Sequence, residues 1–278
     1  MLYKTILINL KKDTNRLEFM TNQLNELGIL FERFEAVNGV EYLEKFGKLG
    51  GDSEYDEKEA IEKGEFGRPF GPGYVGCSLS HKRCYQKFLT EWGDGVDYCL
   101  IFEDGVSLSK DFKEIIEKEM RENLDRKENE RWNYLQFDYP KNNFNIFAKY
   151  KLQYSIYKSI KNKKAKIKRL PILILAPIFT FIESLRMWFL SNFKKGVHPV
   201  WKRVPPNCGA YIVDRRVTQK FVKENEKIIH YADYLTNFVY KKYGKNFNFS
   251  IYYPKIARQY GEKFSSSLNI LNDNHKNL

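Results

Sequence analysis

The chain has 278 residues, of which 42% are hydrophobic, 29% are charged and 16% are aromatic, and its formal net charge is +12. These proportions exclude a disordered or fibrous chain, because aromatic and apolar side chains supply the buried area that offsets chain entropy. The length suits one large or two small globular domains.

The N-terminal sequence MLYKTILINL has no small-residue cleavage site, so we expect no secretory signal. The four cysteines are Cys77, Cys84, Cys99 and Cys208. They form no C-x-x-C pair, so their spacing does not support a zinc site, and they are too few for a disulfide scaffold. We expect reduced, mostly buried thiols in a cytosolic protein.

The first 40 residues carry a strand–helix–strand pattern. Residues 5–10 (TILINL) predict a buried strand, and a helix with leucine and methionine at helical spacing follows, up to a stop at Gly28. Residues 29–37 predict a second strand, which ends at a turn formed by Asn38 and Gly39. This order indicates a βαβ unit and a parallel sheet.

The remainder of the chain alternates between helical and strand patterns after a loop-like, glycine-rich stretch at residues 47–76. We expect helices over residues 78–92, 112–124, 217–229 and 234–243, and strands over residues 98–102, 134–137, 209–213 and 247–253. The predicted fold class is α/β, with a basic and apolar helical insert of about 60 residues. We therefore expect three parts, at residues 1–140, 141–203 and 204–278.

The whole basic excess lies in residues 139–203, which hold 15 Lys or Arg and one acid, Glu183. A Lys-rich half, residues 149–169, precedes an apolar half, residues 170–193. This combination is typical of an interfacial membrane anchor, and each Lys near an anionic leaflet adds about 1 kcal/mol of attraction. The alternatives are a buried core helix, a true span, which would place Glu183 and Arg186 in hydrocarbon, and a nucleic-acid contact. Nucleic acid ranks last, because stacking platforms need no long apolar stretch.

Polar side chains follow the predicted strands at their carboxyl ends, where ligands bind in open α/β sheets. Asn9 follows the first strand, Glu103 and Asp104 follow YCLIF, and Asp138 follows YLQF. Paired acids at a strand end suit a divalent metal that bridges a diphosphate. The alternative interpretation is a simple Asp-Gly turn formed with Gly105.

The glycine-rich segment at residues 71–81 matches neither the P-loop nor the dinucleotide-binding pattern. Ser80 and His81 within it are adjacent in sequence, which does not place them as a nucleophile–base pair.

Together these motifs resemble glycosyltransferase family 25, the sugar transferases of lipooligosaccharide biosynthesis. No single motif is sufficient, but their order and spacing are specific. The motifs are INL followed by Arg16, FEAVNG (residues 34–39), VGCSLSH (75–81), FEDGV (102–106), GAYIVDRR (209–216), HYADY (230–234) and YPKIARQ (253–259). The insert at residues 141–201 has no counterpart that we can match.

The resemblance implies a GT-A-like, Rossmann-type sheet that binds a UDP-sugar, usually UDP-galactose or UDP-glucose, together with a divalent metal, usually manganese. The implied reaction is an inverting transfer of the hexose to a lipid-linked, lipooligosaccharide-type saccharide. Because such acceptors grow on the cytoplasmic leaflet, the expected location is the cytoplasmic face of a bacterial inner membrane. Residues 149–195 would contact its anionic surface, and no nucleic-acid partner is expected.

The resemblance also assigns roles to individual residues. It implies that the nucleotide sugar contacts Asn9, Leu10, Arg16, Ala36, Asn38, Ser80, His81 and Glu103. It implies metal ligation by Asp104 and His230, although His230 could also be a phosphate contact or an exposed loop histidine. The general base that takes the acceptor proton is expected to be Asp233 or Asp138.

One position departs from the family pattern. The family usually shows Glu-Asp-Asp, whereas this chain has Glu103, Asp104 and Gly105. The metal requirement could therefore be weak or absent, since Lys or Arg can also neutralise a leaving diphosphate. A catalytically inactive family member that acts as a membrane-associated glycan-binding or assembly protein is the rival hypothesis.

Overall fold

The computed structural model describes residues 3–64, 69–93, 95–139, 195–200 and 203–259, and a few single residues between 140 and 194. The chain divides into two compact units, Met1–Tyr139 with Val197–Leu278, and Pro140–Gly196. The predicted basic and apolar insert lies largely outside the described residues, so its helical structure stays a prediction. Among the residues that are described, no helix has both the length and the apolar character that crossing a bilayer requires.

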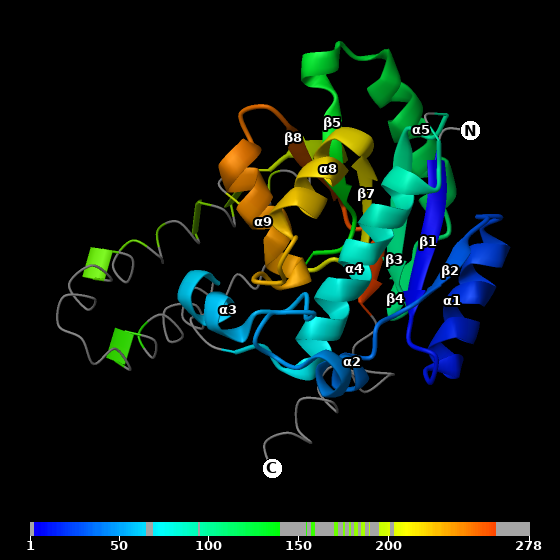
Figure 1. Ribbon diagram of the computed structural model, residues 1–278. Coiled ribbons are helices and arrows are strands. Elements are labelled where there is room, and N and C mark those ends of the chain that lie inside the picture. The colour runs from blue at the N-terminus through cyan, green and yellow to red at the C-terminus, as the bar shows by residue number, and fades with distance from the viewer. Residues whose placement is uncertain are drawn as a thin grey trace. The chain divides into compact units, whose positions relative to one another are not determined.

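The first unit begins with the predicted βαβ unit (Figure 1). Strand β1 (Tyr3–Asn9) pairs in parallel with β2 (Glu32–Glu35), and α1 (Thr14–Glu26) connects them. Gly28 lies just beyond α1 with φ of +63°, a left-handed conformation that glycine adopts at little cost. The predicted stop at Gly28 and the parallel pairing are therefore confirmed.

The central sheet has seven strands in the order β2-β1-β3-β7-β5-β8-β6. The pairs β1–β3 and β5–β8 are parallel, whereas β7 runs antiparallel to both of its neighbours, β3 and β5. The α/β fold class is confirmed, with one reversed strand in the middle of the sheet. The remaining strands are β3 (Tyr98–Glu103), β5 (Trp132–Gln136), β6 (Gly196–Pro199), β7 (Ala210–Asp214) and β8 (Asn248–Tyr253).

Helices cover both faces of this sheet (Figure 1). One apolar cluster joins Ile6 and Ile101 of the sheet to α4 (Pro72–Thr90), α8 (Arg215–Glu224) and α9 (Ala232–Tyr243). A second cluster joins Leu7 and Leu100 to α1 and to α5 (Phe112–Asp125). Adjacent strand residues belong to opposite clusters because side chains alternate across a strand.

Two expectations for residues 38–76 are wrong. Asn38 does not begin a simple turn: its side chain accepts a hydrogen bond from the Val40 N–H and caps α2 (Gly39–Phe46). The stretch after it is not all loop, because it contains α3 (Glu57–Lys63) and α4 already begins at Pro72. A Cβ at Gly39 would lie 1.7 Å from the Pro72 carbonyl oxygen, so only glycine permits this approach of α2 to α4.

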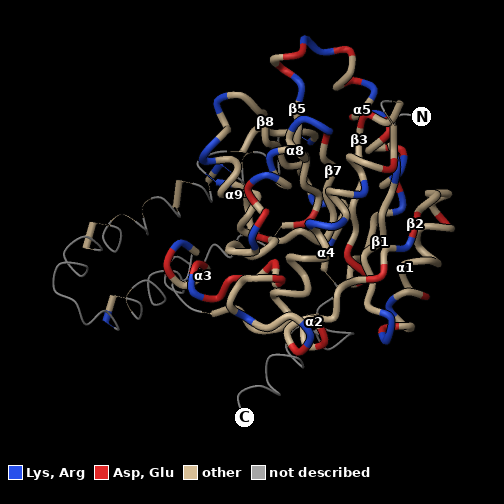
Figure 2. Tube along the Cα trace, viewed as in Figure 1, with Lys and Arg blue, Asp and Glu red and all other residues tan. Residues whose placement is uncertain are grey.

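A short antiparallel ribbon lies beside the end of β3. Strands β4 (Val106–Leu108) and β9 (Ala257–Gln259) pair with each other, with Val106 opposite Gln259. Outside residues 139–203 the chain holds 32 basic and 34 acidic residues. Both signs of charge are interspersed along the described part of the chain (Figure 2). The net positive charge is therefore a property of the insert, not of the sheet unit.

Candidate functional site

The carboxyl ends of β1 and β3 lie side by side and bring together three residues that the sequence predicted. Asn9 Nδ2 donates a hydrogen bond of 2.7 Å to Oδ2 of Asp104, and Arg16 Nη1 lies 3.3 Å from Oδ1 of the same carboxylate. Asn9 in turn accepts a hydrogen bond from Arg33. The first strand and the acidic motif therefore form one polar cluster.

Asp104 is 8% exposed, and its surroundings have opposing effects on its pKa. Burial raises the pKa of Asp104 to about 6, although the Asn9 amide and the Arg16 guanidinium lower it. Its carboxyl group therefore titrates close to neutral pH. A group of this kind in a polar cluster at a strand end is a candidate for ligand binding.

Glu103 lies at the centre of a second group of contacts. Its Oε1 lies 3.2 Å from Nε2 of His81 and accepts from the thiols of Cys208 at 3.4 Å and Cys77 at 3.7 Å. Its Oε2 accepts a hydrogen bond of 3.3 Å from Gln259. Burial raises the pKa of Glu103, but the His81 ring and the two thiols outweigh that effect, so the pKa is lowered overall. Glu103 is therefore an anion in this group.

His81 is 1% exposed and lies deep in the same group. Burial lowers its pKa, yet hydrogen bonds with Cys77 and Glu103 raise it to about 10. The other ring nitrogen, Nδ1, lies 2.7 Å from the Tyr211 hydroxyl. The structure thus places His81 beside the acidic motif. Its role as a direct nucleotide contact is still a prediction.

The two candidate bases both contact the segment at residues 207–209. Asp233, in the first turn of α9, accepts a hydrogen bond of 3.1 Å from Cys208. Asp138 accepts one of 3.4 Å from Asn207, and its Oδ2 lies 2.8 Å from where a Cβ on Gly209 would be. Burial raises the pKa of both carboxyls, to about 6 for Asp138, and the charge of Glu103 adds to the effect. Three carboxyl groups, those of Asp104, Asp138 and Asp233, thus lie close enough to Glu103 for its charge to raise their pKa.

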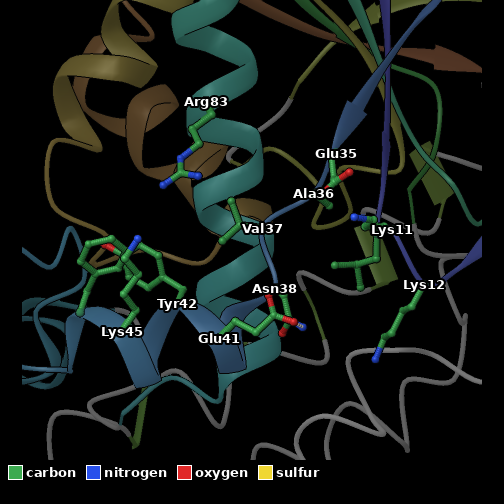
Figure 3. A pocket seen from close by; sticks show the side chains of 12 residues that line it. Lys11, Lys12, Glu35, Ala36, Val37, Asn38, Glu41, Tyr42, Lys45 and Arg83 are labelled. Atoms are coloured by element: carbon green, nitrogen blue, oxygen red, sulfur yellow. Dashed lines mark hydrogen bonds between the residues drawn. The ribbon is translucent and has the colours of Figure 1, made fainter.

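An open pocket of about 630 Å³ begins where β1 ends (Figure 3). It contains three predicted nucleotide contacts, Leu10, Ala36 and Asn38. Four cations line it against two acids: Lys11, Lys12, Lys45 and Arg83 against Glu35 and Glu41. A pocket of this size suits a small ligand, and its excess of cations favours an anionic one. Because Leu10 follows Asn9, the pocket is continuous along the chain with the Asp104 cluster.

Two predicted site residues are buried within the fold. Ser80 Oγ donates to the Gly76 carbonyl oxygen at 2.7 Å and accepts from the Val37 N–H at 2.9 Å, so it joins α4 to the segment after β2. His230 is 3% exposed, and its ring stacks on Phe238 with centroids 4.2 Å apart. It is not an exposed loop histidine. Its role as a metal ligand stays a prediction.

Sequence reasoning missed four residues of the Glu103 group: Cys77, Cys208, Tyr211 and Gln259. One signal was present, since Cys77 and His81 are four residues apart and share a helix face. The others come from β7, from the segment before it and from β9, and no sequence spacing links them.

The residues around Asp104 do not fit the manganese site that the family pattern implies. Both Asp104 oxygens contact Asn9 or Arg16, and Gly105 offers no carboxylate. Manganese prefers oxygen ligands, whereas the group of described residues with metal-binding geometry contains two thiols. A requirement for manganese is therefore still only a prediction, and no chemical step is derived through it.

A mixed α/β sheet with acids and a cation-lined pocket beyond the carboxyl ends of its strands is the arrangement in which open α/β sheets bind ligands. The model of Glycosyltransferase family 25 (LPS biosynthesis protein) matches residues 2–236. The chain therefore belongs to glycosyltransferase family 25, which confirms the resemblance. As a family member it is a sugar transferase of lipopolysaccharide biosynthesis.

Two further comparisons add little. No curated protein matches the chain in sequence. A solved structure described as a glycosyltransferase involved in the glycosylation of the major capsid of PBCV-1 aligns over 100% of both chains. The identity is 8% and the TM-score 0.35, so no argument rests on that likeness.

Proposed function

We propose that this family member transfers a hexose, galactose or glucose, from a UDP-sugar to a lipooligosaccharide-type saccharide with inversion at the transferred carbon. The observation that carries the proposal is the contact between Asn9 and Asp104. It joins the acid group at the end of β3 to the pocket that begins at Leu10. A donor with its nucleotide in the pocket would place its diphosphate beside Arg16.

The pocket supports a nucleotide diphosphate as the ligand. Lys11 and Lys12 follow β1 directly and line the pocket. Arg83 pairs with Glu54 at 3.3 Å, and Lys45 lies over the Phe46 ring, so these two cations also have partners within the protein. Lysines and Arg16 would then stabilise the negative charge that develops on the departing UDP.

Asp233 is the better candidate for the general base. An inverting transfer needs one group that takes the proton of the acceptor hydroxyl as that oxygen bonds to the sugar carbon and the bond to UDP breaks. Asp138 is 1% exposed, whereas Asp233 is half-buried and therefore more accessible to an acceptor. Burial raises the pKa of Asp233, which makes it a stronger base than an exposed aspartate.

The direct test is transfer of labelled hexose from its UDP donor to a lipooligosaccharide acceptor, with and without manganese. Asp104→Ala should reduce kcat/KM at least about 100-fold, because the variant loses the carboxylate that orients Arg16 and Asn9. Asp97→Ala is the matched control, since Asp97 is an exposed aspartate just before β3. Wild-type activity in Asp104→Ala would remove the acidic motif from the chemistry.

Gly105 favours a second candidate function, a family member that binds the donor without turnover. The missing acid is the one that the family pattern would place near a metal. Calorimetry with UDP, combined with the transfer assay, separates the two candidates. Binding of UDP without transfer to any lipid-linked saccharide would support a glycan-binding or assembly role.

We further propose that residues 149–195 hold the protein on the cytoplasmic face of the inner membrane, where lipid-linked acceptors are found. The described apolar side chains of this segment support the proposal, because they are 41–53% exposed: Leu170, Leu175, Ile178, Phe181, Ile182, Leu185 and Phe189. Binding to anionic lipid vesicles should persist at high salt. Binding only to nucleic acid, with a steep loss on adding salt, would contradict the membrane proposal.

A further inference from the structure

Four side chains converge beside the acidic motif. The proposed sugar transfer gives these four side chains no joint role. They are Cys77 and His81 from α4, Glu103 from the end of β3, and Cys208 from the segment before β7. One ligand atom of each, two sulfurs, one ring nitrogen and one carboxylate oxygen, lies within 4.8 Å of the other three. Residues distant in sequence thus present four donors to one point.

The spacing of these atoms agrees with a tetrahedral metal site. Zinc bound at about 2.3 Å to sulfur and about 2.0 Å to nitrogen or oxygen holds its ligand atoms roughly 3.3 to 3.8 Å from one another. Here His81 Nε2 lies 3.2 Å from Glu103 Oε1 and 3.4 Å from Cys208 Sγ. Glu103 Oε1 lies 3.4 Å from Cys208 Sγ and 3.7 Å from Cys77 Sγ. These four of the six edges agree with one tetrahedron to about 0.2 Å. The other two edges, both from Cys77 Sγ, are no longer than 4.8 Å.

We propose that Cys77, His81, Glu103 and Cys208 bind one Zn²⁺ ion. The metal would be held by two thiolates, one neutral imidazole and one carboxylate, so the protons of both thiols and the extra proton of the His81 ring would leave to solvent. Two sulfurs and a nitrogen favour zinc over manganese or magnesium, which prefer oxygen. The proposal does not depend on the sugar transfer, and it concerns a different ligand set from the predicted pair Asp104 and His230.

Surrounding groups support this ligand set. The Tyr211 hydroxyl, 2.7 Å from Nδ1 of His81, fixes the ring so that Nε2 faces the other three donors. The Tyr85 hydroxyl lies 2.8 Å from that of Tyr211 and extends the network. Outer contacts of this kind orient metal-binding histidines in known zinc sites.

The position is buried but can be reached from solvent. His81 and Cys208 are 1% and 2% exposed, whereas the Glu103 side chain is 25% exposed and Cys77 is half-buried. A metal could therefore enter from the Glu103 side. Once bound, it would fix α4 to the end of β3 and to the segment before β7, so it would position Glu103 among the neighbouring carboxyl groups.

The test is a titration of the reduced, full-length protein with Co²⁺, which reports tetrahedral geometry and thiolate ligation in its absorption spectrum. We expect one equivalent to give intense ligand-field bands and a sulfur-to-cobalt charge-transfer band, both removed by one equivalent of Zn²⁺. Cys77→Ser and Cys208→Ser should lose the charge-transfer intensity, whereas Cys84→Ala should keep it. Cys84 is a buried thiol on the same helix that lies outside the group.

Folded wild-type protein that gives no cobalt bands in excess Co²⁺, or Cys77→Ser and Cys208→Ser variants with unchanged bands, would overturn the proposal. The wild-type titration needs no variant, so it decides the question even if a serine variant fails to fold. Because the readout is a spectrum, the result does not depend on transferase activity. An inactive protein that binds cobalt would still support the zinc site, and an active protein that binds no cobalt would refute it.

Discussion

Asn9 and Asp104 are 95 positions apart in the sequence, yet the Asn9 amide donates a hydrogen bond of 2.7 Å to the Asp104 carboxylate. The same amide donates to the Asp13 carbonyl oxygen, and the Asn9 oxygen accepts from Arg33. Asn9 thus connects both parallel neighbours of β1 at their carboxyl ends. It determines where the acidic motif lies relative to the pocket.

Asn9→Ala should therefore lower both stability and donor affinity. The variant leaves a buried carboxylate oxygen without its amide donor, which costs about 1–3 kcal/mol. The pKa of Asp104 should rise above its present value of about 6, because the Asn9 hydrogen bond lowers it. Urea denaturation measures the first effect, and the acid limb of the kcat/KM profile should move to higher pH. Asn22→Ala, on the exposed face of α1, should change neither.

Asp233→Asn should reduce kcat at least about 100-fold with little change in KM for the UDP donor, since it removes the group that takes the acceptor proton. Asp138→Asn should lose far less activity, because Asp138 is buried and inaccessible to an acceptor. Steady-state kinetics of the two variants compare the candidates directly. A larger loss in Asp138→Asn would reverse the assignment.

Asp138 should make the folded protein less stable as pH rises. Burial raises its pKa from 3.8 to about 6, so the folded state binds more protons than the unfolded state between those values. The contribution of Asp138 to the free energy of unfolding is fully present below its unfolded pKa of 3.8. It is lost as pH rises through the folded pKa of about 6, by up to about 3 kcal/mol. Asp138→Asn should remove this penalty.

The stability difference between Asp138→Asn and wild type should then grow in favour of the variant between about pH 4 and about pH 7.5. Urea unfolding at both pH values measures it. Asp97→Asn, at an exposed position, serves as the control and should show no such trend. A pH-independent difference for Asp138→Asn would mean that its pKa is not raised in the folded state.

Gly105→Asp should strengthen the dependence on manganese. A Cβ at Gly105 meets only Arg16 Nη1, at 3.9 Å, so the larger residue can be accommodated there. The new carboxylate would restore the Glu-Asp-Asp pattern and offer manganese an oxygen ligand. Transfer assays with manganese and with a chelator compare the variant with wild type and with Gly105→Ala. Equal metal dependence in all three proteins would show that position 105 does not control it.

Much of the fold could be predicted because local patterns carry it. Leucine and methionine spacing defined α1, and the apolar runs around Ile6 and Leu100 defined the central strands. The helix at residues 78–92 was predicted, but its start at Pro72 was missed, since the first turn of α4 is rich in glycine, which has low helix propensity. That turn is stabilised by packing against Gly39, a contact that no local pattern reveals.

The candidate site was predictable only where residues follow strands. Asn9, Asp104 and Asp138 were found because polar residues at strand ends meet at one edge of an α/β sheet. Cys208 was not found, because β7 runs antiparallel and brings the segment before its start to that same edge. A reversed strand in the middle of the sheet cannot be inferred from the sequence of β7 alone.

The most direct test of the proposed function is a crystal structure of the protein with UDP bound. The account predicts that the uridine occupies the pocket lined by Leu10 and Asn38, and that the diphosphate lies beside Arg16 and Asp104. A diphosphate bound at the opposite edge of the sheet, away from Asp104, would contradict it.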